Sequence, residues 1–390
     1  LAAEELEKTE IELKKLQGNL NGMFYLRIVP IASWYYSDAD HLVKAGLHGI
    51  DAGQPAVDAL VPYADILGLK GSKSFIGGSA EDRIQTAVLT MGKITPKIDE
   101  IGAKVSLMQK EIDQVNPGHY PALLGGKKIQ DQLIQLRTVT DQSAVFLTQA
   151  KPLIKVLPSL LGEPTEKKYL VLFQNDKERR PTGGFLTAYA LFRVDRGIIH
   201  VDASNDIYTL DATIPNKPVA PRPILQYLPQ VSQLNVRDTN LSPDFIESMK
   251  LFNELYTEAG LYKKVDGIIS LDTHALVSIM NVLGDIQVGG TTFTTKEVPS
   301  CKCPQVILEL ESQADRPVGY VRTDRKSIIG DLMLAIMNKA FASSPKVYWG
   351  PLFQAMITET NQKHVLFYIY NPDAQAGIEA LNAAGRIVDF

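Results

Sequence analysis

Hydrophobic residues recur at alternating intervals of three and four along two long segments of the first half of the chain. Such spacing is typical of a helix that packs along a partner at 3.5 residues per repeat. In the first segment Pro96 removes one backbone donor, so we expect that helix to kink or split near Thr95. The repeat positions are Ile84, Ala87, Met91, Ile94, Ile98, Ile101, Val105, Met108, Ile112 and Val115, and then Ile129, Leu133, Leu136, Thr140, Ser143, Leu147, Ala150, Ile154 and Leu157. The pattern predicts two long helices.

A chain reversal is expected between these two helices. Pro117–Gly118 and Gly125–Gly126 lie there, and such residues favour turns, so the helices should form an antiparallel hairpin. Residues 4–20 repeat the same hydrophobic spacing. Residues 38–68 are also helical in pattern, and we expect the glycine and proline at 53–55 to break that helix.

Together these segments predict an N-terminal long-helix bundle or stalk over residues 1–162. Apolar stripes on helices most often pack within the core of their own bundle. Association between chains through the same helices, and hence an oligomer, stays open as an alternative. The chain begins at Leu1 without a Met, and we expect that a membrane anchor preceded the first helix. It ends in the apolar run 387–390, where we expect a cut at a domain boundary or inside a strand.

The pattern changes after Gly162–Thr165, which marks the expected domain boundary. Short apolar runs rich in β-branched and aromatic residues predict strands beyond it. Asp195–Gly197 lies between two of the runs and predicts a hairpin turn. The runs are residues 169–173, 185–194, 197–201, 265–271, 286–288 and 365–370.

Helices are expected between these strands. Ser242 suits the start of the first because its hydroxyl can cap free amides, Pro243 fits the first turn, and Gly260 ends it. Further helices are expected over residues 274–283 and 326–342. Strands that alternate with helices predict a three-layer α/β/α domain over residues 165–390. The whole chain therefore has an expected α + α/β fold.

Composition excludes several classes of protein. The 390 residues are 45% hydrophobic, enough for a sizeable core, and no apolar run reaches the roughly 18 residues of a membrane span. The net charge is −4, so binding of nucleic acid through bulk positive charge is not expected. Any anion site must instead be a local cluster of arginines.

Cysteines and histidines offer no recognisable metal motif. Cys301 and Cys303 are the only cysteines, too few for a four-ligand zinc site, and we interpret them as free thiols or a labile pair. The six histidines show no metal-binding spacing, and His274, near an expected helix start, is interpreted as structural. Motifs of common hydrolases and of zinc proteases are also absent.

The densest polar cluster spans residues 174–185, directly after an expected buried strand. Ligands of open α/β sheets bind beyond the carboxyl ends of strands, which makes this position informative. Arg179 and Arg180 could hold a phosphate or carboxylate, with Asn175 beside them. Thr182, Gly183 and Gly184 would let backbone amides approach a ligand, or would simply form a tight turn. The alternative is a solvated loop with an internal Arg–Glu pair.

Two further polar clusters are candidates. Arg237 and Asp238 precede an expected helix and could bind an anion or lock a loop. Asp206 and Asp211, with Asp238, could hold a hard cation such as Mg²⁺. Two or three carboxylates are weak evidence for a metal site, so no cofactor is certain.

The stretch Tyr169–Phe185 resembles the signature of an uncharacterised bacterial envelope family, the domain-of-unknown-function family 4012. Later blocks of that family are matched by Asp206–Tyr208, Val236–Asn240, Ser242–Phe245 and Val265–Asp272. The resemblance implies a membrane helix ahead of this chain, an extracytoplasmic body, and a further β-rich part beyond residue 390.

The same blocks are distantly similar to the LytR-CpsA-Psr family, most clearly from Val265 to Val288. That family transfers glycopolymers from a polyprenyl pyrophosphate carrier to the cell wall, with arginines on the pyrophosphate and aspartates on magnesium. Arg180 falls near one of its arginines. Thr182 stands where that family has an aspartate, and Asn205–Asp206 stands where it has an Arg–Asp pair.

Two functions follow as expectations. The first is a membrane-anchored extracytoplasmic envelope protein that binds a phosphate-bearing lipid, such as a polyprenyl phosphate, or a cell-wall glycopolymer, as a scaffold or binding protein. The alternative is a metal-assisted phosphotransferase of the LytR-CpsA-Psr type. The changed aspartate positions favour the first, and the sequence assigns no catalytic residue.

Overall fold

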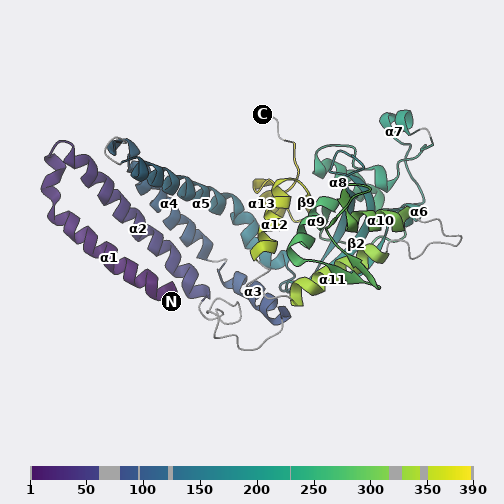
Figure 1. Ribbon diagram of the computed structural model, residues 1–390, viewed down its shortest axis with the longest axis horizontal. Helices are drawn as coiled ribbons and strands as arrows, with labels where there is room; N and C mark the ends of the chain where they lie inside the picture. The colour runs from purple at the N-terminus through teal and green to yellow at the C-terminus, as the bar shows by residue number, and fades with distance from the viewer. Residues whose placement is uncertain are drawn as a thin grey trace. The chain divides into compact units, whose positions relative to one another are not determined.

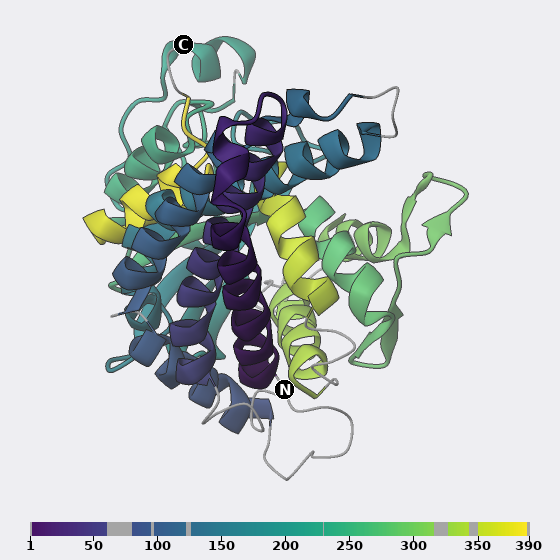
Figure 2. The same ribbon diagram turned by 90° about the vertical axis from the view of Figure 1, so that its left-hand side faces the viewer.

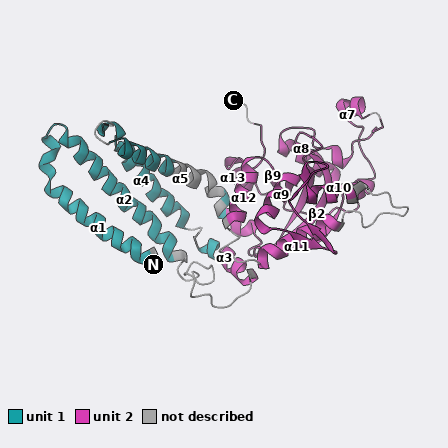
Figure 3. Ribbon diagram, in the orientation of Figure 1, with its two compact units in different colours: residues 1–76, 89–155 teal, residues 77–88, 156–390 magenta. Residues whose placement is uncertain are grey.

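The computed structural model divides the chain into two compact units (Figure 3). The first comprises Leu1–Ile76 and Leu89–Lys155, and the second Gly77–Val88 and Val156–Phe390. The structure describes residues 2–60, 80–94, 97–121, 126–228, 230–315, 327–342 and 350–387. The apolar run at 387–390 therefore lies almost wholly outside the described residues.

Long helices make up the first unit (Figures 1 and 2). Gly46 and Gly53 of α2 pack on Leu13 and Leu6 of α1, so these two helices run antiparallel. The helices of this part, including α3 and the short 3-10 turns, are α1 (Ala2–Gly22), η1 (Phe24–Ile28), α2 (Ala32–Leu60), α3 (Ala80–Ile94), α4 (Ile98–Gln114), η4 (Pro117–His119) and α5 (Lys127–Leu160).

Polar pairs between helices fix the packing of α4. Gln109 donates to Asp141 on α5 at 2.8 Å, and Lys155 donates to Asp99 at 3.0 Å, so α4 and α5 form the expected antiparallel hairpin. On its other side α4 lies against α2, where Lys104 contacts Asp51 at 2.9 Å. The N-terminal helical bundle predicted from the hydrophobic spacing is therefore observed.

Two details of the helical prediction change. The helix expected around Pro96 is indeed two helices, α3 and α4, but the first nine residues of α3 belong to the second unit, where Ile84 and Val88 pack beside Gly197. The break expected at 53–55 is absent, because α2 continues through Pro55 to Leu60. A proline costs a helix roughly 3 kcal/mol, and the packing of α2 along α1 and α4 offsets that loss. Residues 61–68 of the same prediction lie outside the described residues.

A five-stranded mixed sheet forms the centre of the second unit, in the order β3-β2-β1-β4-β9. β1 pairs with β4 in parallel, whereas the β1–β2, β2–β3 and β4–β9 pairs are antiparallel. The strands of this sheet are β1 (Lys167–Asn175), β2 (Phe185–Asp195), β3 (Ile198–Asp206), β4 (Gly267–Asp272) and β9 (Val365–Ile369).

Helices cover both faces of the sheet. Alternate residues of β1 point to opposite faces: Leu170 and Leu172 join the core under α8, and Val171 and Phe173 join the core under α9, α10 and α11. The helices of the second unit are α6 (Ile207–Ala212), α7 (Arg222–Tyr227), η6 (Val236–Asp238), α8 (Phe245–Thr257), α9 (Thr273–Leu283), α10 (Gln305–Asp315), α11 (Ser327–Ala342), α12 (Gly350–Asn361) and α13 (Pro372–Ala380). The three-layer α/β/α arrangement expected from the sequence is thus confirmed.

Short hairpins account for the remaining strands. Residues 286–288 form a strand as expected, but β5 (Ile286–Val288) pairs with β6 (Thr291–Phe293) outside the main sheet. β7 (Glu297–Val298) pairs with β8 (Cys303–Pro304). Cys301 and Cys303 are joined by a disulfide rather than free, since their Cα atoms lie 5.2 Å apart, within the usual range for such a bond. Within the part of the chain that the structure describes, no helix combines the length and apolarity needed to cross a membrane.

Candidate functional site: an arginine-lined pocket

The loop from β1 to β2 is formed by its glycines. Gly183 has φ of +114°, which a side chain would strain, and its amide donates to the carbonyl of Arg180 at 3.1 Å. A Cβ on Gly184 would lie only 2.2 Å from the carbonyl oxygen of Asn175. Of the two interpretations that the sequence left open for these glycines, the structure shows the tight turn, and neither residue lines the pocket described below.

Thr182 anchors the same loop through buried hydrogen bonds. Its hydroxyl donates to Gln174 at 2.8 Å and accepts from the Asn240 amide at 3.0 Å, and all three side chains are buried. Asn240 also donates to the carbonyl of Gly184 at 2.8 Å, and Gln174 contacts Ser270 on the neighbouring strand. Thr182, predicted to bind an anion, is therefore a support of the loop that does not reach the pocket surface.

Arg180 and Arg237 converge on the buried Asp238. The side-chain contacts are 3.9 Å from Arg180 Nη2 and 3.8 Å from Arg237 Nε to the two oxygens of that carboxylate. Each guanidinium also lies over an aromatic ring, Arg180 at 5.5 Å from the Phe185 centroid and Arg237 at 4.5 Å from that of Tyr208. Two fixed guanidinium groups at one place form a site that favours phosphate or carboxylate.

Asp211 has a different place from the one predicted. It is buried, and its carboxylate accepts from the Val236 amide at 2.6 Å, pairs with Arg237, and lies 3.6 Å from Lys217. Asp211 therefore orients Arg237 from behind and does not line the pocket. Sequence spacing could not reveal this, because the partners lie 6 and 26 residues away from it in the chain.

The predicted metal set of Asp206, Asp211 and Asp238 is not assembled. Asp206 caps α6 by accepting from the Tyr208 amide at 2.8 Å, while the other two carboxylates face arginines. Of the described residues, three metal-capable side chains come within 4.8 Å of one another only at His274, Glu359 and His364. Each of the three aspartates instead has a cationic or backbone partner.

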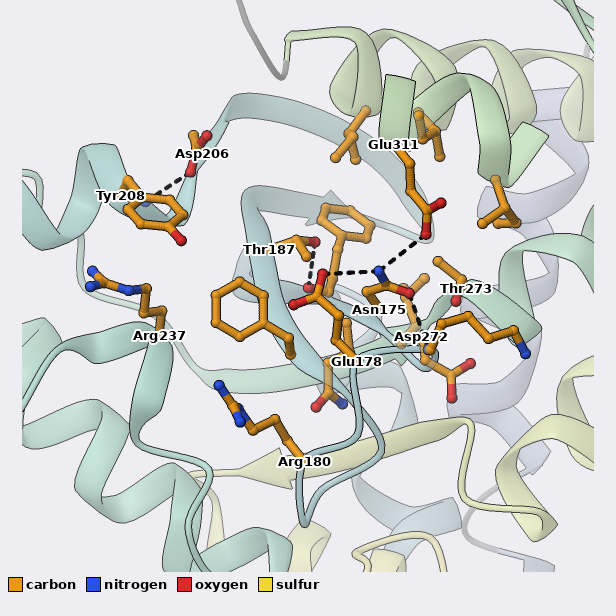
Figure 4. Close-up of a pocket in the computed structure, with 18 of the residues that line it drawn as sticks. Asn175, Glu178, Arg180, Thr187, Asp206, Tyr208, Arg237, Asp272, Thr273 and Glu311 are labelled. Atoms are coloured by element: carbon orange, nitrogen blue, oxygen red, sulfur yellow. Dashed lines mark hydrogen bonds between the residues drawn. The ribbon is translucent and has the colours of Figure 1, made fainter. Parts of the chain in front are cut away.

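The arginines open into a pocket of about 940 Å³ within the second unit (Figure 4). Its other wall is apolar and is built from β1, α9, α10 and α11 by Phe173, Leu276, Ile307, Leu310, Ile329 and Met333. Tyr208 also lines it, and burial raises the pKa of that hydroxyl, which therefore stays protonated and can donate a hydrogen bond. The pocket thus combines two guanidinium groups, several carboxylates and an apolar wall.

Carboxylates lie across the pocket from Arg237. Asn175, predicted as an anion ligand, donates its amide to Glu178 at 3.2 Å and to Glu311 at 3.3 Å. In Figure 4, Asn175, Glu311 and Thr273 lie on the side of the pocket away from Arg237 and Tyr208. Sequence reasoning missed Glu311 because helix α10 was not predicted, and it treated Glu178 only as a possible partner of an arginine.

The end of β4 adds Asp272 to the pocket rim. Burial raises the pKa of Asp272, and the bonds it accepts from His364 at 2.6 Å and from the Ala275 amide offset only part of that effect. Next to it, Asp176 is also partly buried, which opposes ionisation. The Thr273 hydroxyl and Lys177 outweigh that burial and hold the pKa of Asp176 below its usual value.

Of the seven predicted anion-binding residues, the pocket brings together Asn175, Arg180 and Arg237. Arg179 is exposed and does not line it. The site therefore depends on one arginine of the Arg–Arg pair, together with an arginine from 57 residues further along the chain.

Fold and site together define an extended helical unit joined to an α/β domain with an arginine-lined, partly apolar pocket. Residues 165–301 match the model of a family described as protein of unknown function (DUF4012), which confirms the resemblance seen in the sequence. No curated protein matches the chain.

Two solved structures are similar to part of the chain. The Lin1025 protein from Listeria innocua is 14% identical, with a TM-score of 0.27 over 56% of this chain and 80% of that one. TagV from B. subtilis is 11% identical, with a TM-score of 0.29 over 56% of this chain and 81% of that one.

Proposed function

We propose that this protein binds a phosphate-bearing lipid or cell-wall polymer at the bacterial cell envelope and acts as a scaffold or binding protein. One observation carries the proposal: a single pocket of about 940 Å³ is lined both by Arg180 and Arg237 and by an apolar wall. A polyprenyl phosphate has the matching two-part chemistry, an anionic head and a hydrocarbon tail.

The head would lie against the two guanidinium groups. Charge-assisted hydrogen bonds from arginine to phosphate are among the strongest in proteins, and two arginines can contact two different oxygens. Asp238 also lines the pocket and partly neutralises both arginines, but it is only 3% exposed.

The tail would lie against the apolar wall that continues into the core between the sheet and α9, α10 and α11. Each buried CH₂ group contributes about 0.8 kcal/mol of binding free energy. A ligand with both parts should therefore bind more tightly than its head group or its tail alone.

The envelope setting rests on the family resemblance and on the cysteines. Disulfides such as Cys301–Cys303 persist mainly outside the reducing cytoplasm, which supports the extracytoplasmic side.

Calorimetric titration tests the proposal with three probes: a short polyprenyl pyrophosphate, inorganic pyrophosphate, and the matching polyprenol. We expect the intact lipid to bind best. Arg180→Gln should weaken its binding by about tenfold to a hundredfold, since a hydrogen bond to a charged group contributes about 1.5–3 kcal/mol.

The matched control is Arg179→Gln, the same change at the neighbouring exposed arginine outside the pocket. It should leave the affinity unchanged. Equal affinity of the wild-type protein and Arg180→Gln, or equal losses in both variants, would overturn the assignment of the anion site.

The second candidate function is a metal-assisted phosphotransferase, and the carboxylate side of the pocket favours it. Glu178 and Glu311 both contact the Asn175 amide, and hard oxygen ligands of this kind suit Mg²⁺, which is often held by one or two carboxylates and a substrate phosphate. Mg²⁺ would supply charge neutralisation at the phosphates. Repeating the titration with and without Mg²⁺, while following cleavage of the probe's phosphoanhydride bond by water to polyprenyl phosphate and inorganic phosphate, separates the two functions, because only a catalyst should consume the lipid.

A further inference from the structure

A second polar cluster lies at the other side of Asp272, outside the arginine pocket. It contains His274 in the first turn of α9, Glu359 near the end of α12, and His364 directly before β9. Figure 1 shows α9 and α12 beside β9. The antiparallel pairing of β4 with β9 brings together side chains that are 85 and 90 residues apart in the sequence.

Backbone bonds hold the cluster in place. The His364 amide donates to the Glu359 carbonyl at 2.8 Å, and the Asp272 amide donates to the His364 carbonyl at 3.1 Å. The two imidazole rings are stacked with centroids 4.0 Å apart. One ligand atom of each of the three residues lies within 4.8 Å of the others before any ligand arrives, although a stacked ring must turn before both imidazoles face one point.

The buried carboxylate of Glu359 has few hydrogen-bond partners. It is 3% exposed, and among the described residues its carboxylate has one hydrogen-bond partner, His274 Nδ1 at 2.8 Å. A carboxylate has about four acceptor positions, and burying it with one of them filled is costly. A bound cation would remove that cost.

His364 is oriented as a metal ligand. Its Nδ1 donates to the buried Asp272 at 2.6 Å, which leaves the lone pair on Nε2. Metal-binding histidines almost always donate their other ring nitrogen to such an outer carboxylate or carbonyl, which fixes the tautomer and the ring. Asp272 would therefore act as the outer partner of the ligand.

We propose that His274, Glu359 and His364 form a binding site for a divalent transition-metal ion of the zinc type. One ligand atom of each lies within 4.8 Å of the others, and two imidazoles with one carboxylate are a donor set that zinc favours. The site does not rest on the proposed function of the arginine pocket.

Entry of the ion needs only a small movement. The His274 side chain is 49% exposed, so the ion can reach the cluster from solvent, and its ring can turn out of the stack until both imidazoles face one point. Three protein ligands leave at least one coordination position open to water or another ligand. Asp176, whose charge acts on His274, adds to the negative potential there.

Zinc titration of the full chain, freed of metal with a chelator, tests this site. We expect one Zn²⁺ per chain with micromolar or tighter affinity and a higher Tm in its presence. His274→Asn should weaken binding at least about tenfold. Asparagine can still donate to Glu359 from nearly the position of Nδ1, so this variant removes the imidazole ligand while keeping the hydrogen bond.

The matched control is His41→Asn. His41 Nδ1 contacts Glu111 at 2.7 Å in the same kind of pair, but His41 belongs to no group of three metal-capable side chains among the described residues. It should bind zinc as the wild-type protein does. No saturable one-to-one binding, or equal affinity in wild type and His274→Asn, or an equal loss in His41→Asn, would each overturn the site.

Circular dichroism and thermal melts of each variant accompany the titration. If His274→Asn fails to fold, nitrogen couplings in the pulsed EPR spectrum of the unaltered protein with one Cu²⁺ decide instead. Couplings from two imidazoles support the site, and couplings from fewer overturn it.

Discussion

The arginine pocket and the histidine cluster lie on either side of Asp272, and they differ in how their buried carboxylates are compensated. Behind the pocket, Asp211 has Arg237, Lys217 and a backbone amide, and Asp238 has two arginines. In the histidine cluster, Glu359 has one imidazole among the described residues. Arginines carry a permanent charge, whereas imidazoles are mostly neutral at pH 7.

This difference teaches that the ligand of a polar cluster follows from its charge balance rather than from the number of its charged residues. Beside the pocket, the two carboxylates Asp211 and Asp238 are matched by the permanent charges of Arg180, Arg237 and Lys217. In the histidine cluster the buried carboxylates of Glu359 and Asp272 face two imidazole rings and no arginine or lysine that the described contacts show, and there we propose a cation. Each prediction below tests one side of that contrast.

The largest effect is expected for Asp211→Ala. This change leaves Arg237 and Lys217 beside an empty site, and removing one partner of a buried ion pair typically lowers the free energy of unfolding by about 3–5 kcal/mol. Urea denaturation measures the difference. Asp211→Asn should cost less, because its side-chain oxygen can still accept from the Val236 amide.

An exposed pair provides the control for this prediction. Arg193 and Asp202 lie 3.1 Å apart between β2 and β3, and such surface pairs contribute about 0–1 kcal/mol. If Asp211→Ala costs no more than Asp202→Ala, burial does not strengthen the Asp211 pair, and the contrast between the two regions fails.

Thr182→Val comes next in size. The change keeps the shape of the side chain but leaves the Gln174 oxygen and the Asn240 amide without one partner, which should cost about 1–3 kcal/mol. The change should also lower the affinity for the lipid probe, because the loop that carries Arg180 loses a hydrogen-bonded support. The affinity for zinc should stay the same. The exposed Thr257→Val on α8 should change stability by less than about 0.5 kcal/mol. Loss of zinc binding with retained lipid binding would contradict the assigned role of Thr182.

Local patterns in the sequence were enough to predict most of the fold. Hydrophobic spacing gave the long helices, and short β-rich runs gave all five strands of the main sheet, because both signals depend on neighbouring residues. The break at 53–55 was wrong, since packing of α2 against other helices outweighs a local proline. Helices α10, α12 and α13 were missed, although α10 provides part of the apolar wall of the pocket.

The candidate site was also only partly predictable from local sequence. Arg180 and Asn175 were found because they directly follow a predicted strand, where ligands of α/β sheets bind. Asp211 was assigned to a metal because its partner Arg237 lies 26 residues away and no local signal links them. The histidines were judged to have no metal spacing, since only the pairing of β4 with β9 brings His274 and His364 together.

The smallest effect, and the one that joins the two regions, is the pH dependence contributed by Asp272. Burial, only partly offset by His364, raises the pKa of Asp272 in the folded protein, so the folded state holds this proton more tightly than the unfolded state does. Its contribution to stability is present below the unfolded pKa of about 3.8 and is lost as the pH rises through the folded value. The wild-type protein should therefore lose stability relative to Asp272→Asn as the pH rises above about 3.8, in metal-free buffer. Asp176, whose pKa is lowered, predicts the opposite slope for Asp176→Asn, because its contribution appears above pH 3.8 and is lost on acidification. Chemical denaturation at several pH values measures both slopes, and parallel slopes for the two variants would show that Asp272 and Asp176 do not differ in their compensation.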